Sequence, residues 1–244
     1  MMQFQDKIVL ITGGGTGVGE AAAAAFAAGG AQVIITGRRT EKLAQVCESI
    51  ASAKPVRYYA ADMANRAQVT ALVEWVNAEF GPIDILVSNA GVNVRERTLA
   101  ELSLEDWDYI MNVNATGAYN IVHAVLPQMR ARKDGVVISV SSIAGIRPSV
   151  LAGAAYSASK HAMTALTKVI SLEEKDNGIR ATAIHPGEIN TPILDDRPVK
   201  VSDEHKANIL QSEDVAAAIL FVAALPPRAN VPELTIKPTN AAFA

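Results

Sequence analysis

The feature that most constrains the fold of this chain is a repeated alternation between short apolar runs and longer helical segments. Six runs rich in β-branched residues lie at 8–11, 32–36, 56–60, 85–87, 136–140 and 181–184. Strands that are buried on both faces have such continuous apolar runs, and helices of this length can join parallel neighbours. The pattern therefore predicts an α/β fold with a doubly wound, mostly parallel sheet and helices on both of its faces. Residues 233–237 can supply a final strand.

Three longer segments lie between these runs or after them. One helix is predicted from about residue 104 towards residue 132, with a kink or break at Pro127, and another from about 155 to 175. Residues 191–211 form the most polar and least regular connection, which is typical of a mobile lid over a binding site. The chain shows no repeat and no linker. We therefore expect residues 1–244 to form one domain with a substrate lid at about 191–211.

Composition excludes several classes of partner. Half of the residues are apolar and 19% are charged, and the net charge of −3 includes no long basic stripe. The chain can therefore bury a large core, and it lacks the charge pattern of a nucleic-acid binder. It has no apolar stretch of the length that spans a bilayer, no signal-peptide pattern, and a single cysteine, Cys47. We expect a cytoplasmic protein that acts on a small molecule, with no membrane partner.

The first strand leads into a glycine-rich turn and then into an alanine-rich helix. The spacing is Gly13-x-x-x-Gly17-x-Gly19. Glycines let the backbone turn tightly and approach a pyrophosphate, and the free N–H groups at a helix start favour its negative charge. The sequence therefore predicts a dinucleotide site in which the turn supplies Gly13, Gly15, Thr16, Gly17, Val18 and Gly19.

The end of the second strand indicates which dinucleotide is preferred. Arg38 and Arg39 stand where proteins that prefer NAD place an acid, and the first acid that follows is Glu41. A guanidinium suits a phosphate, and two cations at a helix start oppose the positive end of the helix dipole unless an anion joins them. We predict NADP(H) as the preferred cofactor, with NAD(H) possible; Arg38 makes the main contact with the 2′-phosphate and Arg39 a supporting one.

Tyr156 and Lys160 are four residues apart in a predicted helix, so both project from one face about one turn apart. A cation beside a phenol stabilises the phenolate and lowers the phenol pKa from about 10. Tyr156 could then give a proton to a carbonyl or take one from an alcohol. A hydroxyl at Ser142 could hold the oxygen of the substrate near it.

Further motifs occur in the order Asn89-Ala90-Gly91, Asn114 within Asn-Ala-Thr-Gly, Ser142-Ile-Ala-Gly, Tyr156-x-x-x-Lys160 and Pro186-Gly187-x-x-x-Thr191. In these motifs, and in the glycine turn, the chain resembles the single-domain branch of the short-chain dehydrogenase/reductase family. The resemblance implies a Rossmann-like fold and an oxidoreductase. The resemblance covers residues 12–191. It includes Asp62, whose counterpart in the family contacts the adenine ring of the cofactor.

The resemblance implies roles for several of these residues. Tyr156 would be the acid and base, Lys160 would also bind the nicotinamide ribose, and Asn114 would serve a water-mediated proton relay. The cofactor contacts implied are with Asp62, Met63, Asn89, Ala90, Gly91, Pro186, Gly187, Ile189 and Thr191. The interval from Ser142 to Tyr156 is about one residue longer than is usual, so Ser141 is an alternative. The Ile-Ala-Gly that follows favours Ser142.

The sequence thus predicts an NADP(H)-dependent oxidoreductase that acts on an alcohol or carbonyl compound, and a homodimer or homotetramer. Alternatives are an NAD-dependent dehydrogenase, a 3-oxoacyl reductase, or a dinucleotide sensor without activity. The C-terminal Leu234-Thr-Ile-Lys-Pro argues against the 3-oxoacyl reductase, because many reductases of that kind have Asp-Gly-Gly there. The four histidines lack metal-ligand spacing, so we expect no metal. Arg95, Arg97, Arg147 and the loop after Thr191 are expected to set the substrate.

Overall fold

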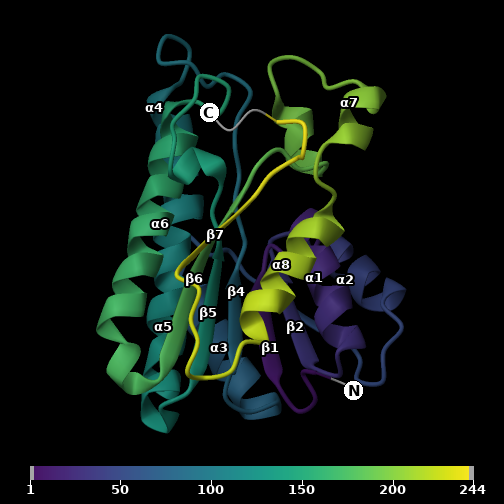
Figure 1. Cartoon of the computed structure of the whole chain (residues 1–244), viewed down its shortest axis with the longest axis vertical. Coiled ribbons are helices and arrows are strands. Elements are labelled where there is room, and N and C mark those ends of the chain that lie inside the picture. Colours follow the sequence, from purple (N-terminus) through teal and green to yellow (C-terminus); the bar gives the residue numbers. More distant parts are fainter. Residues whose placement is uncertain (1–2, 242–244) are drawn as a thin grey trace.

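The computed structural model describes residues 3–241 and contains one sheet of seven parallel strands (Figure 1). The strands lie in the order β3-β2-β1-β4-β5-β6-β7. Their bounds are β1 (Ile8–Thr12), β2 (Gln32–Gly37), β3 (Arg57–Ala60), β4 (Ile85–Ser88), β5 (Gly135–Val140), β6 (Ile179–Pro186) and β7 (Glu233–Ile236). The doubly wound sheet predicted from the sequence is therefore confirmed.

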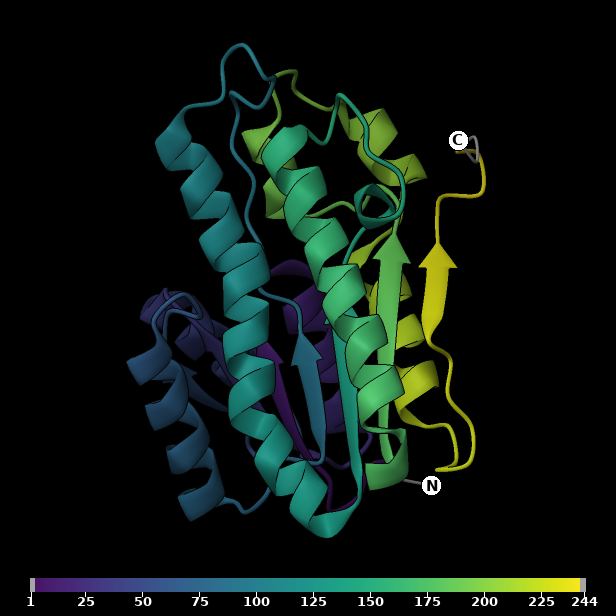
Figure 2. The same cartoon turned by 90° about the vertical axis from the view of Figure 1, so that its left-hand side faces the viewer.

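Helices cover both faces of this sheet. The α-helices are α1 (Gly17–Ala28), α2 (Thr40–Ser49), α3 (Arg66–Glu79), α4 (Leu104–Met111), α5 (Gly117–Arg132), α6 (Ala154–Glu173), α7 (Asp203–Asn208) and α8 (Ser212–Ala223). Helices α1, α2 and α8 pack on one face, and α3, α5 and α6 pack on the other. Figure 2 shows α5 and α6 side by side across their face.

The sheet separates two hydrophobic cores, and the strands supply alternate residues to each of them. In β1, Val9 and Ile11 pack with α1 and α8, whereas Leu10 packs with α3 and α5. Successive side chains of a strand point to opposite faces, so a strand between two helical layers must be apolar at every position. This is why β4 and β5 are buried along their whole length.

The helix predicted to run from residue 104 to 132 is interrupted, but not at Pro127. Helix α5 continues through Pro127 to Arg132. The irregular part is a π-helical turn over Asn112–Thr116, which joins α4 to α5. The predicted break was therefore wrong in its position. Such wide turns are rare and are frequently found at functional sites, and this one contains Asn114.

The strand order reverses beside β1, because the chain first builds β2 and β3 on one side of it and then β4 to β7 on the other. At such a point the loops that leave two neighbouring strands diverge and open a crevice at their carboxyl ends. The loops from β1, β4 and β6 and the short helix α7 all lie at this end of the sheet (Figure 1).

Candidate active site

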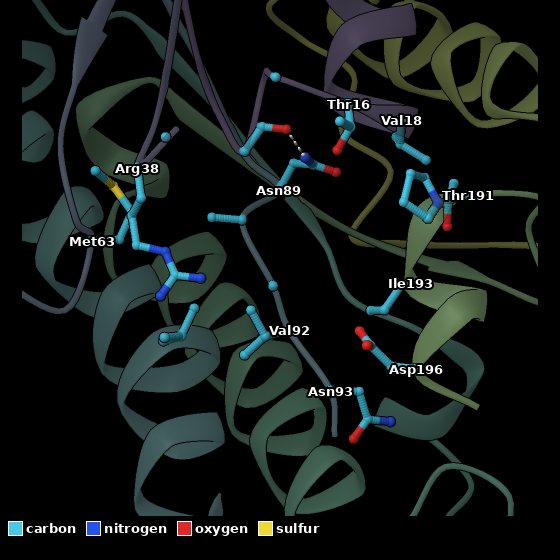
Figure 3. A pocket seen from close by; sticks show the side chains of 18 of the residues that line it. Thr16, Val18, Arg38, Met63, Asn89, Val92, Asn93, Thr191, Ile193 and Asp196 are labelled. Atoms are coloured by element: carbon cyan, nitrogen blue, oxygen red, sulfur yellow. Dashed lines mark hydrogen bonds between the residues drawn. The ribbon is translucent and has the colours of Figure 1, made fainter. Parts of the chain in front are cut away.

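A cleft of about 920 Å³ lies at the carboxyl end of the sheet. Its lining comes from the glycine turn, the end of β2, the loops after β3, β4 and β6, and the starts of α2 and α6. Figure 3 shows Arg38 and Met63 on one side of the cleft and Thr191, Ile193 and Asp196 on the other, with Asn89 and Val92 between them. Residues distant in the sequence therefore meet at the point where the strand order reverses.

In the glycine turn, the backbone at Gly19 packs directly against the backbone at Gly13. A Cβ at Gly19 would lie 2.3 Å from the carbonyl oxygen of Gly13, so a side chain at that position would push the turn apart. Helix α1 begins at Gly17, and the Thr16 side chain before it makes no capping hydrogen bond. The first N–H groups of the helix are thus available to an anion.

A set of hydrogen bonds fixes the turn to the end of β4. The hydroxyl oxygen of Thr12 accepts from the backbone N–H groups of Asn89 at 2.9 Å and Ala90 at 3.0 Å. The Asn89 side-chain amide donates to the carbonyl groups of Thr12 at 3.0 Å and Gly13 at 3.2 Å. The Asn-Ala-Gly motif therefore holds the two strands on either side of the switch point in register.

Three cations line one end of the cleft, namely Arg38, Arg39 and Lys42. Arg38 is exposed, and its Nη2 donates a 2.9 Å hydrogen bond to the hydroxyl of Tyr109 on α4. The Arg38 guanidinium also lies 5.6 Å from the centre of the Tyr109 ring. These contacts hold the guanidinium across the cleft beside α4, where it can meet a phosphate.

Tyr156 and Lys160 both line the cleft from the first turns of α6. Burial raises the pKa of Tyr156 to about 12, while a hydrogen bond from the Ser142 hydroxyl and the positive charge of Arg97 oppose this rise. The Lys160 Nζ lies 5.6 Å from the centre of the Tyr156 ring. The structure therefore brings Ser142, Tyr156 and Lys160 together.

Lys160 is a buried cation that is only 3% exposed. Its Nζ donates to the carbonyl oxygen of Val140 at 2.9 Å, and burial lowers the pKa of its ammonium group to about 8. A Cβ built on Gly91 would lie 3.3 Å from this Nζ. The Nζ also donates to the sulfur of Met163 at 3.8 Å. Its remaining proton can therefore serve a ligand beside the Asn-Ala-Gly motif.

The two neighbouring serines have different surroundings. The Ser141 hydroxyl is buried and donates to the carbonyl oxygen of Lys160 at 3.0 Å, and it lies 2.9 Å from the Thr164 hydroxyl. The Ser142 hydroxyl faces Tyr156. The carbonyl group of Ser142 in turn lies 3.2 Å from Nδ1 of the buried His185. Ser141 lines the cleft, and Ser142 is not among the lining residues. Ser142 is still the better candidate to reach a substrate, because the Ser141 hydroxyl is engaged by Lys160 and Thr164, whereas the Ser142 hydroxyl meets Tyr156.

Asn114 is fully buried in the π-helical turn. Its side-chain oxygen accepts from the backbone N–H of Val92 at 2.8 Å, and its amide donates to the carbonyl oxygen of Val92 at 2.9 Å. The amide also donates to Ser159 at 3.0 Å, whose hydroxyl donates to the carbonyl oxygen of Tyr156 at 2.8 Å. The Asn114 side chain thus joins the loop after β4 to the helix that carries Tyr156.

The remaining predicted residues divide into two groups. Those that line the cleft are Gly13, Gly15, Thr16, Gly17, Val18, Asp62, Met63, Asn89, Ala90, Gly91, Ile189 and Thr191. Those that are not among the lining residues are Gly19, Asn114, Ser142, Pro186 and Gly187. Gly187 donates its N–H to the carbonyl oxygen of Ile236 at 2.7 Å, so it anchors β7 and does not face the cleft.

Lys42, Tyr109 and Asp106 are among the lining residues that are not in the cofactor site predicted from the sequence. Lys42 follows the arginine pair by one helical turn, which is a signal that the sequence did contain. Tyr109 belongs to the Arg38 end of the cleft because its hydroxyl accepts a hydrogen bond from Arg38. Asp106 of the same helix also lines the cleft. No local pattern marks the last two, because α4 approaches the second strand only in the folded chain.

Within residues 3–241, no group of three or more His, Cys, Asp or Glu side chains is arranged to hold a metal ion. None of the helices in this described part of the chain is long and apolar enough to cross a membrane.

Comparisons with known proteins agree with this architecture. An uncharacterised oxidoreductase of Staphylococcus saprophyticus is 34% identical over 243 residues, which cover 98% of this chain and 100% of that protein. A closed form of serine dehydrogenase complexed with NADP+ is 30% identical, with a TM-score of 0.86 and 97% of each chain covered. A 3-ketoacyl-(acyl-carrier-protein) reductase from Brucella melitensis, complexed with NADH, is 29% identical, with a TM-score of 0.87 and 97% of this chain and 98% of that chain covered.

Residues 7–201 match the sequence profile of the short chain dehydrogenases. The matched range contains the glycine turn, the Asn-Ala-Gly motif and the Tyr156 and Lys160 pair. The chain therefore belongs to the short-chain dehydrogenase family.

Proposed function

We propose that this protein is an NADP(H)-dependent oxidoreductase that interconverts an alcohol and a carbonyl compound, with Tyr156 as general acid and base. One observation carries the proposal: Tyr156 and Lys160 line the same cleft as the glycine turn and Arg38. A dinucleotide bound with its pyrophosphate at α1 and its 2′-phosphate at Arg38 has room to place its nicotinamide beside Tyr156. The cofactor would supply or accept the hydride.

The surroundings of Tyr156 suit proton transfer in both directions. Its pKa of about 12 keeps the hydroxyl protonated and ready to donate to a carbonyl oxygen. A hydroxyl from Ser142 and two positive charges, from Lys160 and Arg97, lie near the ring. Each of these groups would stabilise the phenolate that forms when the proton leaves. Ser142 would also hold the substrate oxygen in place.

Lys160 and Asn114 would maintain this arrangement. Lys160 has one proton that is used by neither Val140 nor Met163, and a ribose hydroxyl beside Gly91 could accept it. Both polar ends of the Asn114 side chain are used by Val92 and Ser159. Its contribution through the side chain is therefore to hold α6 at the right distance from the loop after β4. A water-mediated relay at Asn114 remains part of the proposal.

The preference for NADP(H) rests on charge. Arg38, Arg39 and Lys42 line the end of the cleft where the adenosine ribose would lie, and a 2′-phosphate would pair with them. The two structural relatives described above were solved with NADP+ in one case and NADH in the other, so they do not decide between the two cofactors.

Residues 191–211 are proposed as a lid over the substrate. Thr191, Ile193 and Asp196 line the cleft on the side opposite Arg38 (Figure 3). The segment contains the short 3₁₀ helix η4 (Pro192–Asp196) and α7, and its polar side chains are mostly exposed. Short helices with little buried surface open at low free-energy cost.

A homodimer or homotetramer is proposed from the outer surfaces of α5 and α6. Tyr119 of α5 and Val169 and Leu172 of α6 are between 45% and 70% exposed. Large exposed apolar groups on neighbouring helices are typical of a subunit interface. Light scattering at micromolar concentration should report a mass of two or four chains, and a monomer would contradict this part of the proposal.

The experiment that tests the function is a panel of alcohols and carbonyl compounds, assayed by nicotinamide absorbance with NADP(H) and with NAD(H). We expect turnover of at least one compound class, with a higher kcat/KM for NADP(H). Tight cofactor binding without turnover of any compound would support a dinucleotide sensor instead.

A further inference from the structure

Arg97 is a buried cation that follows the cleft-lining residues Arg95 and Glu96 in the sequence. It lies in the loop between β4 and α4 and is only 5% exposed. Its Nη1 donates to the carbonyl oxygen of Leu151 at 3.2 Å, and its Nη2 donates to the carbonyl oxygen of Asp196. One guanidinium thus joins three segments: the loop after β4, the loop before α6, and the end of η4 in the proposed lid.

The loop before α6 is shaped to receive this side chain. Gly153 has a φ of +82°, and a Cβ built on it would lie 2.7 Å from both the Cβ and the carbonyl oxygen of Arg97. A larger residue at Gly153 would displace Arg97 or the loop. Helix α6 begins at the next residue, and Tyr156 follows within its first turn. The position of Arg97 is therefore tied to the position of Tyr156.

The charges around Arg97 leave it without a close carboxylate partner among the described residues. The charged or titratable groups that face it are Asp196 and Arg197 from the end of η4 and Tyr156 from α6. Its two hydrogen-bond acceptors are carbonyl groups, and its Nε is buried without a hydrogen-bond partner. A buried guanidinium is costly unless its charge is used.

The charge acts on Tyr156. The positive charge of Arg97 lowers the pKa of Tyr156, against the larger effect of burial. The other groups that face Tyr156 are the Ser142 hydroxyl and Lys160. Two cations lie near Tyr156 among the residues that the structure describes, namely Lys160 and Arg97. Of these, Arg97 is the one that is hydrogen-bonded to the proposed lid, through the Asp196 carbonyl group.

We propose that Arg97 is a positioning residue that fastens the 192–196 turn to the start of α6, so that a closed lid and a positive charge near Tyr156 occur together. The inference rests on the proposed role of Tyr156. When the lid opens, the Asp196 carbonyl leaves and the guanidinium loses one of its two anchors. Closure over a substrate thus prepares the tyrosine for proton transfer.

Two substitutions separate the anchoring role from the charge. Arg97→Gln removes the charge and shortens the side chain, whereas Arg97→Lys keeps the charge but cannot reach both carbonyl groups in a fork. The matched control is Arg228→Gln, because Arg228 is exposed and lies outside the cleft lining. Near-ultraviolet circular dichroism and thermal melting establish that each variant is folded.

The first readout is the rate of proteolytic cleavage between residues 191 and 211, followed by mass spectrometry. We expect both Arg97 variants to be cleaved several-fold faster than the wild type, and Arg228→Gln to be cleaved at the wild-type rate. The second readout is the pH dependence of kcat/KM for alcohol oxidation, which rises as Tyr156 loses its proton. Arg97→Gln should shift this rise upward by about half a pH unit or more, and Arg97→Lys should leave it near its wild-type position.

Wild-type cleavage in a folded Arg97→Gln, or an unshifted pH profile for it, would overturn the proposal. If Arg97→Gln does not fold, the cleavage rate of Arg97→Lys decides: faster cleavage supports an anchoring role, and the wild-type rate excludes it. The cleavage rate is measured without turnover, so this test of the anchoring role is valid even if the protein does not catalyse the proposed reaction. Tyr156→Phe, which keeps Arg97, should be cleaved at the wild-type rate.

Discussion

One wall of the cleft, beside the glycine turn, is made mostly of backbone, whereas another, formed by the loop after β4 and by η4, is made mostly of polar side chains. In the first wall, N–H groups of α1 and small residues face the cleft, and Thr12 and Asn89 fix them through short hydrogen bonds. In the second wall, the loop after β4 supplies Asn93, Arg95 and Glu96, and η4 supplies Asp195 and Asp196. The first suits a ligand whose shape does not vary, and the second can change its specificity by single substitutions.

Tyr156 lies between the two walls, and its hydroxyl is the group on which both are expected to converge. Tyr156→Phe removes this hydroxyl and keeps nearly all of the ring volume. We expect turnover to fall by about 10²- to 10⁴-fold, because general acid and base catalysis contributes about that much. The measurement is kcat for a verified substrate, with a thermal melt to show that the fold is retained. Near-normal turnover would remove Tyr156 from the mechanism.

Arg38 is one of the three cations at the end of the cleft beside α2, and its removal should separate the two cofactors. Arg38→Ala should raise the KM for NADP(H) by about 10- to 100-fold, because hydrogen bonds to charged groups contribute about 1.5 to 3 kcal/mol. The KM for NAD(H) should change little. Direct titration of each cofactor by fluorescence checks this without turnover, and Arg228→Ala is the control. An equal loss for both cofactors would show that Arg38 does not bind the 2′-phosphate.

The backbone wall should be intolerant of added atoms at one glycine and tolerant at another. Gly19→Ala would place a Cβ 2.3 Å from the carbonyl oxygen of Gly13, which is a fixed part of the turn. We expect it to reduce the free energy of unfolding by about 1 to 3 kcal/mol. Gly15→Ala is the matched control, since its nearest contact would be the Lys42 Cβ at 3.4 Å. Urea denaturation of both variants gives the comparison, and equal stabilities would contradict it.

Lys160 should make stability depend on pH in a direction opposite to that of a lysine held in an ion pair, whose pKa is raised by folding. Its folded pKa of about 8 lies below the usual lysine value of 10.5, so between these values the unfolded chain binds more protons. The free energy of unfolding should therefore rise with pH across this window, by about 1 to 2 kcal/mol between pH 8 and 9.5. Lys160→Met should lack this increment in urea denaturation. The same rise in both proteins would assign it to other groups.

The fold was predictable because hydrophobic periodicity is a local property. Run 181–184 lies inside β6, and run 8–11 lies inside β1, with the ends shifted by one or two residues. Pro127 shows the limit of a local rule, because packing on the sheet keeps α5 helical through it, and the irregular turn forms at Asn114 instead. That turn is held by Val92, which is 22 positions away in the sequence.

The same contrast, between local sequence patterns and contacts of distant residues, applies to the residues of the candidate site. The glycine spacing and the Tyr156 and Lys160 pair could be found because each lies within one turn or one helix. Arg97 could be proposed only as one of several arginines near the substrate, because its partners Leu151 and Asp196 are 54 and 99 positions away. Tyr109 likewise meets Arg38 across 71 positions. Side chains that act through distant contacts carry no local signal.

The most direct test of hydride transfer in this cleft uses NADPH that carries deuterium at C4, together with a carbonyl compound that the substrate panel has identified. Mass spectrometry of the alcohol formed by the wild-type protein should place the deuterium on the carbinol carbon, and the hydroxyl hydrogen should come from solvent, delivered by Tyr156. Alcohol that carries no deuterium when both C4 positions of the cofactor are labelled, or NADPH that stays bound and unoxidised, would contradict the proposed function.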